Sequence, residues 1–146
     1  MLHYKNILVA VDLSPFSNKI LEKAKEIAAK SNAKINLVHV MEHSPLSFSG
    51  EFSIPMDPNF EQQLESQVLE ALSSLGEKFD IPTENLYLKQ GSVGHVVSDL
   101  ATAIDADLLI VGTHGHRGLE ILLGSRANAI LHQSFCDVLS VRMQEQ

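Results

Sequence analysis

The sequence contains no tryptophan and only one cysteine, Cys136. A single cysteine excludes an intramolecular disulfide and suits a reducing compartment. No apolar run approaches the roughly 20 residues of a membrane-spanning helix. Residues 1–6 lead into the first apolar run without the architecture of a signal peptide. These absences predict a soluble, cytoplasmic protein that does not associate with a membrane.

Basic residues are also scarce. The 11 lysines and arginines are outnumbered by 18 aspartates and glutamates, which gives a formal net charge of −7. Proteins that bind nucleic acid normally present a basic face, so this balance argues against nucleic acid as a partner. An anionic ligand would have to be held by backbone N–H groups and a few local cations.

What the chain does contain is aliphatic. Hydrophobic residues make up 45% of its 146 residues, which is enough for one buried core. We therefore expect residues 1–146 to form a single domain.

Apolar runs alternate with segments of helical spacing along the whole chain. The runs predict strands at 7–11, 35–41, 86–90, 108–111 and 138–141. In the first helix, Ser14 is the expected N-cap and Pro15 the first helical residue. A second helix starts at Pro58 after a long loop, and its apolar face comprises Leu64, Val68, Ala71, Leu72, Leu75 and Phe79. Gly91-Ser92 begins a third helix, and a fourth spans about 125–133.

This alternation predicts an α/β fold, namely a doubly wound, Rossmann-like parallel sheet of five strands in the order 3-2-1-4-5. In such a sheet, ligands bind beyond the carboxyl ends of the strands, where the strand order reverses. That position lies between the first and fourth strands, which end at Asp12 and Gly112. We expect His39, within the apolar second strand, to be a core residue or a wall of this site.

The segment after the fourth strand is rich in glycine, with Gly112, Gly115 and Gly118 followed by Gly124-Ser125. Glycine lets the backbone approach a ligand closely, and free N–H groups at a helix start attract phosphate. Arg117 or Arg126 would supply local positive charge. Simple turn chemistry between a strand and a helix is the alternative interpretation. Asp12 likewise either caps the turn that follows it or acts on phosphate through a divalent cation.

Three stretches together resemble the universal stress protein family. The first two are residues 6–14 and 37–40. The third extends from Gly112 to residue 141 and contains Gly112-Thr113-His114-Gly115, then Gly124-Ser125, then residues 136–141. The similarity extends essentially from end to end. It implies a sheet of the kind found in adenine nucleotide alpha hydrolases, and a protein that binds ATP, AMP or ADP with Mg²⁺ or Mn²⁺ as a sensor or switch in the stress response.

The resemblance also implies roles for particular residues. Ala10, Val11 and Asp12 would line one side of the nucleoside, with Asp12 reaching the nucleotide-bound metal ion, and Val40 would meet the adenine. The glycine motif would hold the ribose and phosphates. It comprises Gly112, Thr113, His114, Gly115, Gly124, Ser125 and Arg126. The resemblance further implies a homodimer that pairs the final strands, Val138–Val141, which the predicted order places at an exposed sheet edge.

One departure from the family pattern supports an alternative. ATP-binding members have nine residues between the two halves of the motif, and here residues 116–123 make eight. A homodimeric interaction module that does not bind nucleotide is therefore a second hypothesis. A slow ATP hydrolase is a third, although no clear general base, Walker lysine or arginine finger stands out.

Overall fold

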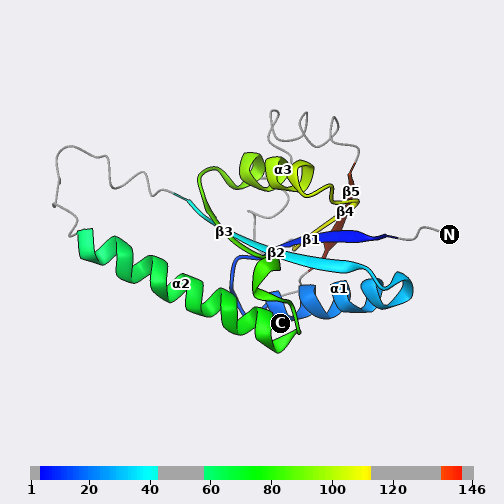
Figure 1. The fold of residues 1–146 in the computed structure, drawn as a ribbon, viewed down its shortest axis with the longest axis horizontal. Helices are drawn as coiled ribbons and strands as arrows, with labels where there is room; N and C mark the ends of the chain where they lie inside the picture. Colours follow the sequence, from blue (N-terminus) through cyan, green and yellow to red (C-terminus); the bar gives the residue numbers. More distant parts are fainter. Residues whose placement is uncertain (1–3, 43–57, 113–135, 143–146) are drawn as a thin grey trace.

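The computed structural model describes residues 4–42, 58–112 and 136–142. Within them lies one parallel sheet in the order β3-β2-β1-β4-β5 (Figure 1). Its strands are β1 (Asn6–Ala10), β2 (Lys34–Met41), β3 (Leu86–Gln90), β4 (Leu108–Gly112) and β5 (Asp137–Val141). The predicted fold class and strand order are confirmed.

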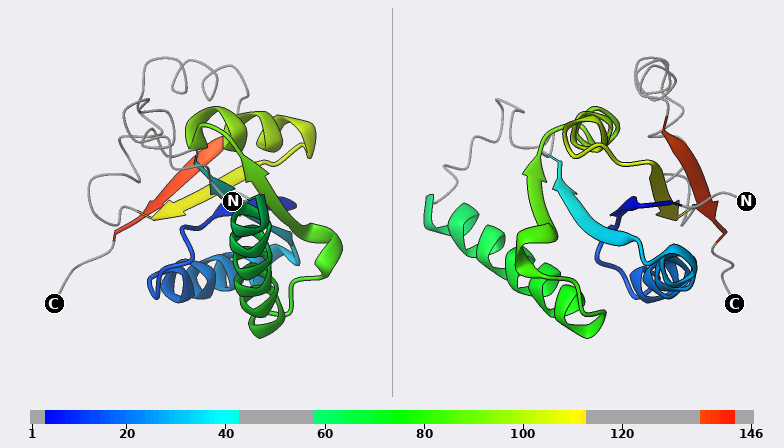
Figure 2. Two further views of the ribbon diagram at one scale, coloured as in Figure 1. Left: turned by 90° about the vertical axis from the view of Figure 1, so that its left-hand side faces the viewer. Right: turned by 45° about the vertical axis from the view of Figure 1, so that its right-hand side comes forward.

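Helices cover both faces of the sheet, as a doubly wound fold requires. On one face lie α1 (Ser17–Ser31) and α2 (Pro58–Lys78), and on the other lies α3 (Val93–Ala103) (Figure 2). A short 3-10 helix, η3 (Thr83–Asn85), precedes β3. The helix expected at 125–133 lies outside the described residues.

The core consists of two apolar clusters separated by the sheet. Ile7, Val9 and Ile110 face α1, whereas Leu8 and Leu109 face α3, and all five are fully buried. Because consecutive residues of β1 and β4 enter opposite clusters, both strands are continuously apolar. This is why unbroken apolar runs located them in the sequence.

The predicted start of α1 is wrong. The helix begins at Ser17 with Phe16 at the N-cap position, not at Ser14-Pro15. A carboxylate oxygen of Asp12 accepts the Ser14 N–H at 2.9 Å, and the Ser14 carbonyl then accepts the Ser17 N–H at 2.9 Å. The chain uses this segment to turn out of the sheet, so regular helix starts two residues later than predicted.

The predicted apolar face of α2 is buried only along its second half. Leu72 is fully buried and Phe79 is buried, whereas Leu64 is 42% exposed and Ala71 is exposed. The helix packs against β3, and its first half extends past the sheet (Figure 1). Periodicity located the face correctly but did not indicate how much of it is covered.

None of the described helices combines the length and apolar character needed to cross a membrane.

Candidate functional site

The carboxyl edge of the sheet is stepped at the point where strand order reverses. Pairing of β1 ends at Ala10, opposite Val38 of β2, and at Val9, opposite Ile110 of β4. Both neighbours continue, because β2 pairs with β3 as far as Met41 and β4 pairs with β5 as far as Gly112. The end of β1 is therefore recessed between two longer strands, where doubly wound sheets bind ligands.

Val11 leaves this recessed end and is held by two contacts with β2. Its N–H donates to the Val38 carbonyl at 3.0 Å, and its carbonyl lies 2.9 Å from Nδ1 of His39. Val11 is buried and His39 is half-buried. His39 thus fixes the backbone that enters the candidate site, which agrees with its expected position as a wall residue.

Asp12 is exposed and organises the turn after β1. One carboxylate oxygen accepts the Ser14 N–H and lies 3.5 Å from the Ser17 hydroxyl, which can donate to it. An aspartate that accepts the N–H two residues on is the usual Asx-turn. This geometry gives Asp12 the turn-capping role. Across the parts of the chain that are described, no three metal-ligating side chains gather into one group.

Two features of this turn were not anticipated from the sequence. Leu13 adopts φ 65°, in the left-handed region that favours glycine. The Ser14 hydroxyl oxygen is buried and has no hydrogen-bond partner among the residues described. Leucine and serine both occur in many backbone conformations. Neither the left-handed backbone of Leu13 nor the buried hydroxyl of Ser14 could therefore be recognised from residue type.

Val40 and Gly112 flank the recessed strand end. Val40 is 8% exposed and belongs to the cluster under α3, so its side chain is committed to the core. In the sheet Val40 is opposite Lys89 of β3. It lies beyond Val38, the last residue of β2 that pairs with β1. Its backbone is therefore the part available to a ligand at this edge. Gly112, the last residue of β4, is half-buried opposite Val141.

The structure thus brings Ala10, Val11, Asp12, Val40 and Gly112 to one edge of the sheet. The remaining predicted site residues lie outside the described residues. They are Thr113, His114, Gly115, Gly124, Ser125 and Arg126.

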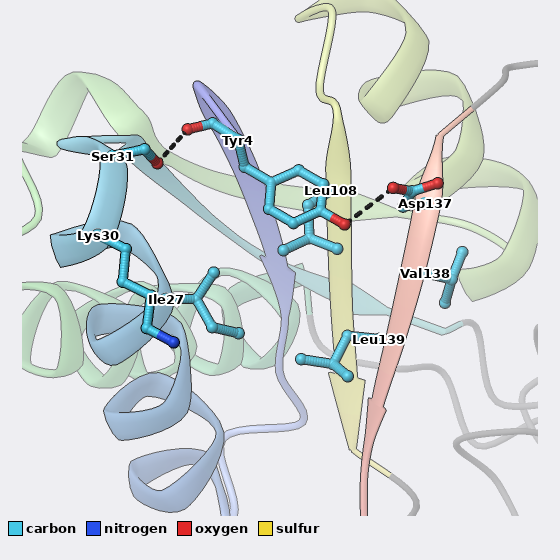
Figure 3. A pocket seen from close by; sticks show the side chains of 8 residues that line it. All are labelled: Tyr4, Ile27, Lys30, Ser31, Leu108, Asp137, Val138 and Leu139. Carbon is cyan, nitrogen blue, oxygen red and sulfur yellow. Dashed lines mark hydrogen bonds between the residues drawn. The ribbon is translucent and has the colours of Figure 1, made fainter. Parts of the chain in front are cut away.

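A hollow with a cavity volume of about 470 Å³ lies at the opposite, amino edge (Figure 3). Ile27 and Leu139 form apolar walls, and Lys30 of α1 stands at its rim. The Tyr4 hydroxyl donates to Asp137 at 2.8 Å, and this hydrogen bond raises the pKa of Tyr4 above its ordinary value. Because the strands begin here, the hollow does not coincide with the candidate site.

Comparison with known proteins decides the family. The model of the universal stress protein family matches residues 3–142. The chain belongs to the universal stress protein family. It is 51% identical to universal stress protein A homolog 1 of Coxiella burnetii, over 99% of this chain and 100% of that relative. Identity to universal stress protein A homolog 2 of the same organism is 34%, over 97% of each chain.

Solved structures of universal stress proteins share the fold. One, a universal stress protein in complex with cAMP, superposes with a TM-score of 0.62 at 23% identity and covers 97% of this chain and 98% of its own. Another, UspA from Lactobacillus plantarum, gives a TM-score of 0.63 at 22% identity and covers 97% of this chain and 100% of its own. At these identities the likeness concerns the fold.

Proposed function

We propose that this universal stress protein binds an adenine nucleotide, ATP with Mg²⁺ or Mn²⁺ in the first instance, and acts as a sensor or switch. The observation that carries the proposal is the recessed end of β1 between longer β2 and β4. Gly112 ends β4 at this step and is the first residue of the glycine motif.

The residues at the edge suit the nucleoside part of such a ligand. Val40 offers backbone to the adenine, and Ala10 and Val11 lie at the end of β1 beside it. The Ser14 hydroxyl, which has no partner within the described part of the chain, is a polar group that a ligand could satisfy. Gly115, Gly124, Ser125 and Arg126 would hold the phosphates, and Asp12 would approach the metal ion that the nucleotide carries. A cAMP complex of a protein with this fold is a reason to include the cyclic nucleotide among the candidates.

A thermal unfolding scan tests the proposal, with ATP and Mg²⁺ compared against AMP, cAMP and GTP. Ligand at about 100 times its dissociation constant adds about 2.7 kcal/mol, which corresponds to a Tm rise of about 9 °C in a domain of this size. A selective rise with ATP supports phosphate binding by the shortened motif. An equal rise with AMP restricts the site to the nucleoside, and no rise at saturating concentrations contradicts the proposal.

Two substitutions connect any rise to the motif. Gly124→Asp and Ser125→Asp place a carboxylate where phosphate is expected, so each should abolish the ATP-dependent shift. Ser66→Asp is the matched control, because Ser66 is exposed on α2. Loss of the shift in the control as well would point to charge at a distance.

A second proposal concerns assembly. In the described sheet β5 forms one edge, and Val138 is 44% exposed on it. Exposed apolar edges favour pairing with another strand. We propose a homodimer in which two β5 strands pair antiparallel. If the protein proves not to bind nucleotide, a homodimeric interaction module is the better explanation of its function.

Antiparallel pairing makes a specific prediction about charge. Opposed residues of two paired strands carry their side chains on the same face, so the two-fold axis passes between a residue and its own copy. With the axis at Leu139, Val138 lies opposite Ser140 of the partner subunit and diagonal to its own copy. Val138→Asp should weaken the dimer, because the two copies of the new charge repel each other, and mixing it with Val138→Lys protein should restore pairing. Light scattering over a dilution series measures this, and a concentration-independent monomer mass in the unmodified protein would contradict the dimer.

A cytoplasmic location is part of the same proposal, because a single cysteine suits a reducing compartment.

A further inference from the structure

The first half of α2 projects beyond the sheet, on the side where β2 ends (Figure 1). Residues 59–71 are exposed, with the exception of half-buried Val68. The second half is anchored by Leu72 and Phe79 in the core. Gly76 lies so close to β3 that a Cβ atom there would be 2.8 Å from the Leu86 side chain. One helix therefore has a fixed half and an uncovered half.

An apolar row crosses from the fixed half into the uncovered one. Phe60, Leu64 and Val68 are spaced by four residues and continue the row of buried Leu72. Phe60 is 53% exposed and Leu64 is 42% exposed. Single exposed apolar residues are ordinary, but a contiguous row is typical of a binding surface.

The charges beside this row all have one sign. Glu61 and Glu65 each follow a residue of the row, and Glu70 lies further along. Residues 58–77 contain neither lysine nor arginine. If two copies packed through this surface, Glu61 and Glu65 of one copy would approach Glu61 and Glu65 of the other. These like charges would repel each other. Nucleic acid and anionic lipid are repelled for the same reason.

We propose that Phe60, Leu64, Val68, Glu61 and Glu65 form a docking surface for a basic amphipathic segment of another protein. Its apolar face would lie along the row on α2, and its lysines or arginines would face the two glutamates. An amphipathic segment on apolar anchors at this spacing is a recurrent mode of recognition, and charge complementarity selects the basic partner. The surface lies on the half of α2 that extends past the sheet, and its role does not depend on nucleotide binding.

Synthetic helical peptides test the surface in the full-length protein. The first peptide, of about 18 residues or five turns, carries leucines along one face and lysines beside them. The second replaces the lysines with glutamates, and the third scrambles the first so that no apolar face remains. Fluorescence anisotropy of the labelled peptides measures binding at low and high salt. We expect the first peptide alone to bind.

Matched variants locate the binding on α2. Phe60→Ser with Leu64→Ser should weaken the first peptide by at least about tenfold, as loss of buried apolar anchors does. Glu61→Gln with Glu65→Gln should weaken it severalfold and reduce its dependence on salt. The control is Ser66→Gln with Glu70→Gln, since both residues are exposed and helical spacing places them away from Leu64 and Glu65. The control should bind like the unmodified protein, and circular dichroism checks that every variant is folded.

Several results would overturn the proposal. Equal binding of the scrambled peptide, or equal effects of the control and test variants, would mean attraction by net charge alone. Failure of the basic amphipathic peptide to bind the unmodified protein would remove the surface as a docking site. A lower mass for the Phe60→Ser, Leu64→Ser variant in sedimentation would mean that a second copy covers the row.

Discussion

The two edges of the sheet are built in different ways. At the amino edge, the Asp107 carboxylate accepts the N–H groups of Lys5 at 2.8 Å and Asn6 at 3.0 Å. Buried Asn36 donates to the Asn6 side chain at 2.7 Å and to the Ile7 carbonyl at 3.1 Å. Polar side chains thus connect β1, β2 and the segment before β4.

At the carboxyl edge the polar groups are less completely used. Leu13 has a left-handed backbone, the Ser14 hydroxyl oxygen is buried without a partner among the described residues, and β1 ends short of its neighbours. Backbone strain and unpaired polar groups concentrate at functional sites. The comparison indicates that one edge stabilises the fold, and it supports the proposal that the other edge binds a ligand.

The largest expected effect is at the amino edge. Asn36→Ala removes two hydrogen bonds donated from a buried position and leaves a cavity there, so we expect a loss of about 2–4 kcal/mol in the free energy of unfolding. Gln90→Ala is the matched control, because Gln90 is an exposed amide on a strand. Urea denaturation measures both. A loss at Asn36 no greater than that at Gln90 would contradict the stabilising role of this edge.

A smaller effect should reveal strain at the carboxyl edge. Leu13→Gly and Leu13→Ala both remove the side chain, which packs against the α1-side core. Only alanine keeps a Cβ in the left-handed region, so the glycine variant should be more stable by about 1 kcal/mol.

The same pair of substitutions at exposed Ser66 of α2 provides the control. There alanine should be the more stable variant by about 1 kcal/mol, because it favours helix. If alanine is also at least as stable as glycine at position 13, Leu13 is not strained.

The smallest expected effect concerns reactivity, not stability. Cys136 precedes β5 at the amino edge, and burial, followed by the charges of Asp137 and Asp107, raises the pKa of its thiol to about 11. At pH 8 on the order of one thiol in a thousand is ionised, and the thiolate is the reactive form. Alkylation by iodoacetamide should therefore be slow at pH 8 and accelerate as the pH rises toward 11.

Asp137→Asn separates the causes of this shift. Removing one negative charge should lower the thiol pKa part of the way and increase the alkylation rate at pH 8, whereas burial keeps the pKa above its ordinary value. Asp99→Asn, at an exposed position on α3, should leave the rate unchanged. A rate profile with its midpoint at the ordinary thiol pKa would contradict the effect of burial.

Much of the fold could be predicted from local pattern. The apolar runs that became β1 and β4 are buried on both sides, so their composition reports their position directly. Strict alternation with helices then restricted the topology to right-handed crossovers, and the order 3-2-1-4-5, one of the common doubly wound orders, is the one observed. Exposed Lys89 and Gln90 suit the position of β3 at an edge of the sheet.

The candidate site was predictable only in part. The ends of β1 and β4 meet as topology requires, which brings Asp12 and Gly112 to the same edge. The roles of Gly124, Ser125 and Arg126 remain predictions. The recessed end of β1 and the contact of His39 with the Val11 carbonyl depend on register between strands distant in sequence.

The sequence by itself determined which residues are apolar, at what period they recur, and hence the kind and order of the elements. Tertiary structure decided where each element stops and how much of its apolar face is covered. In α2 the same period includes Leu64 and Leu72, yet only Leu72 is buried. Periodicity is a property of one helix, whereas burial depends on where β3 and the sheet end beneath it.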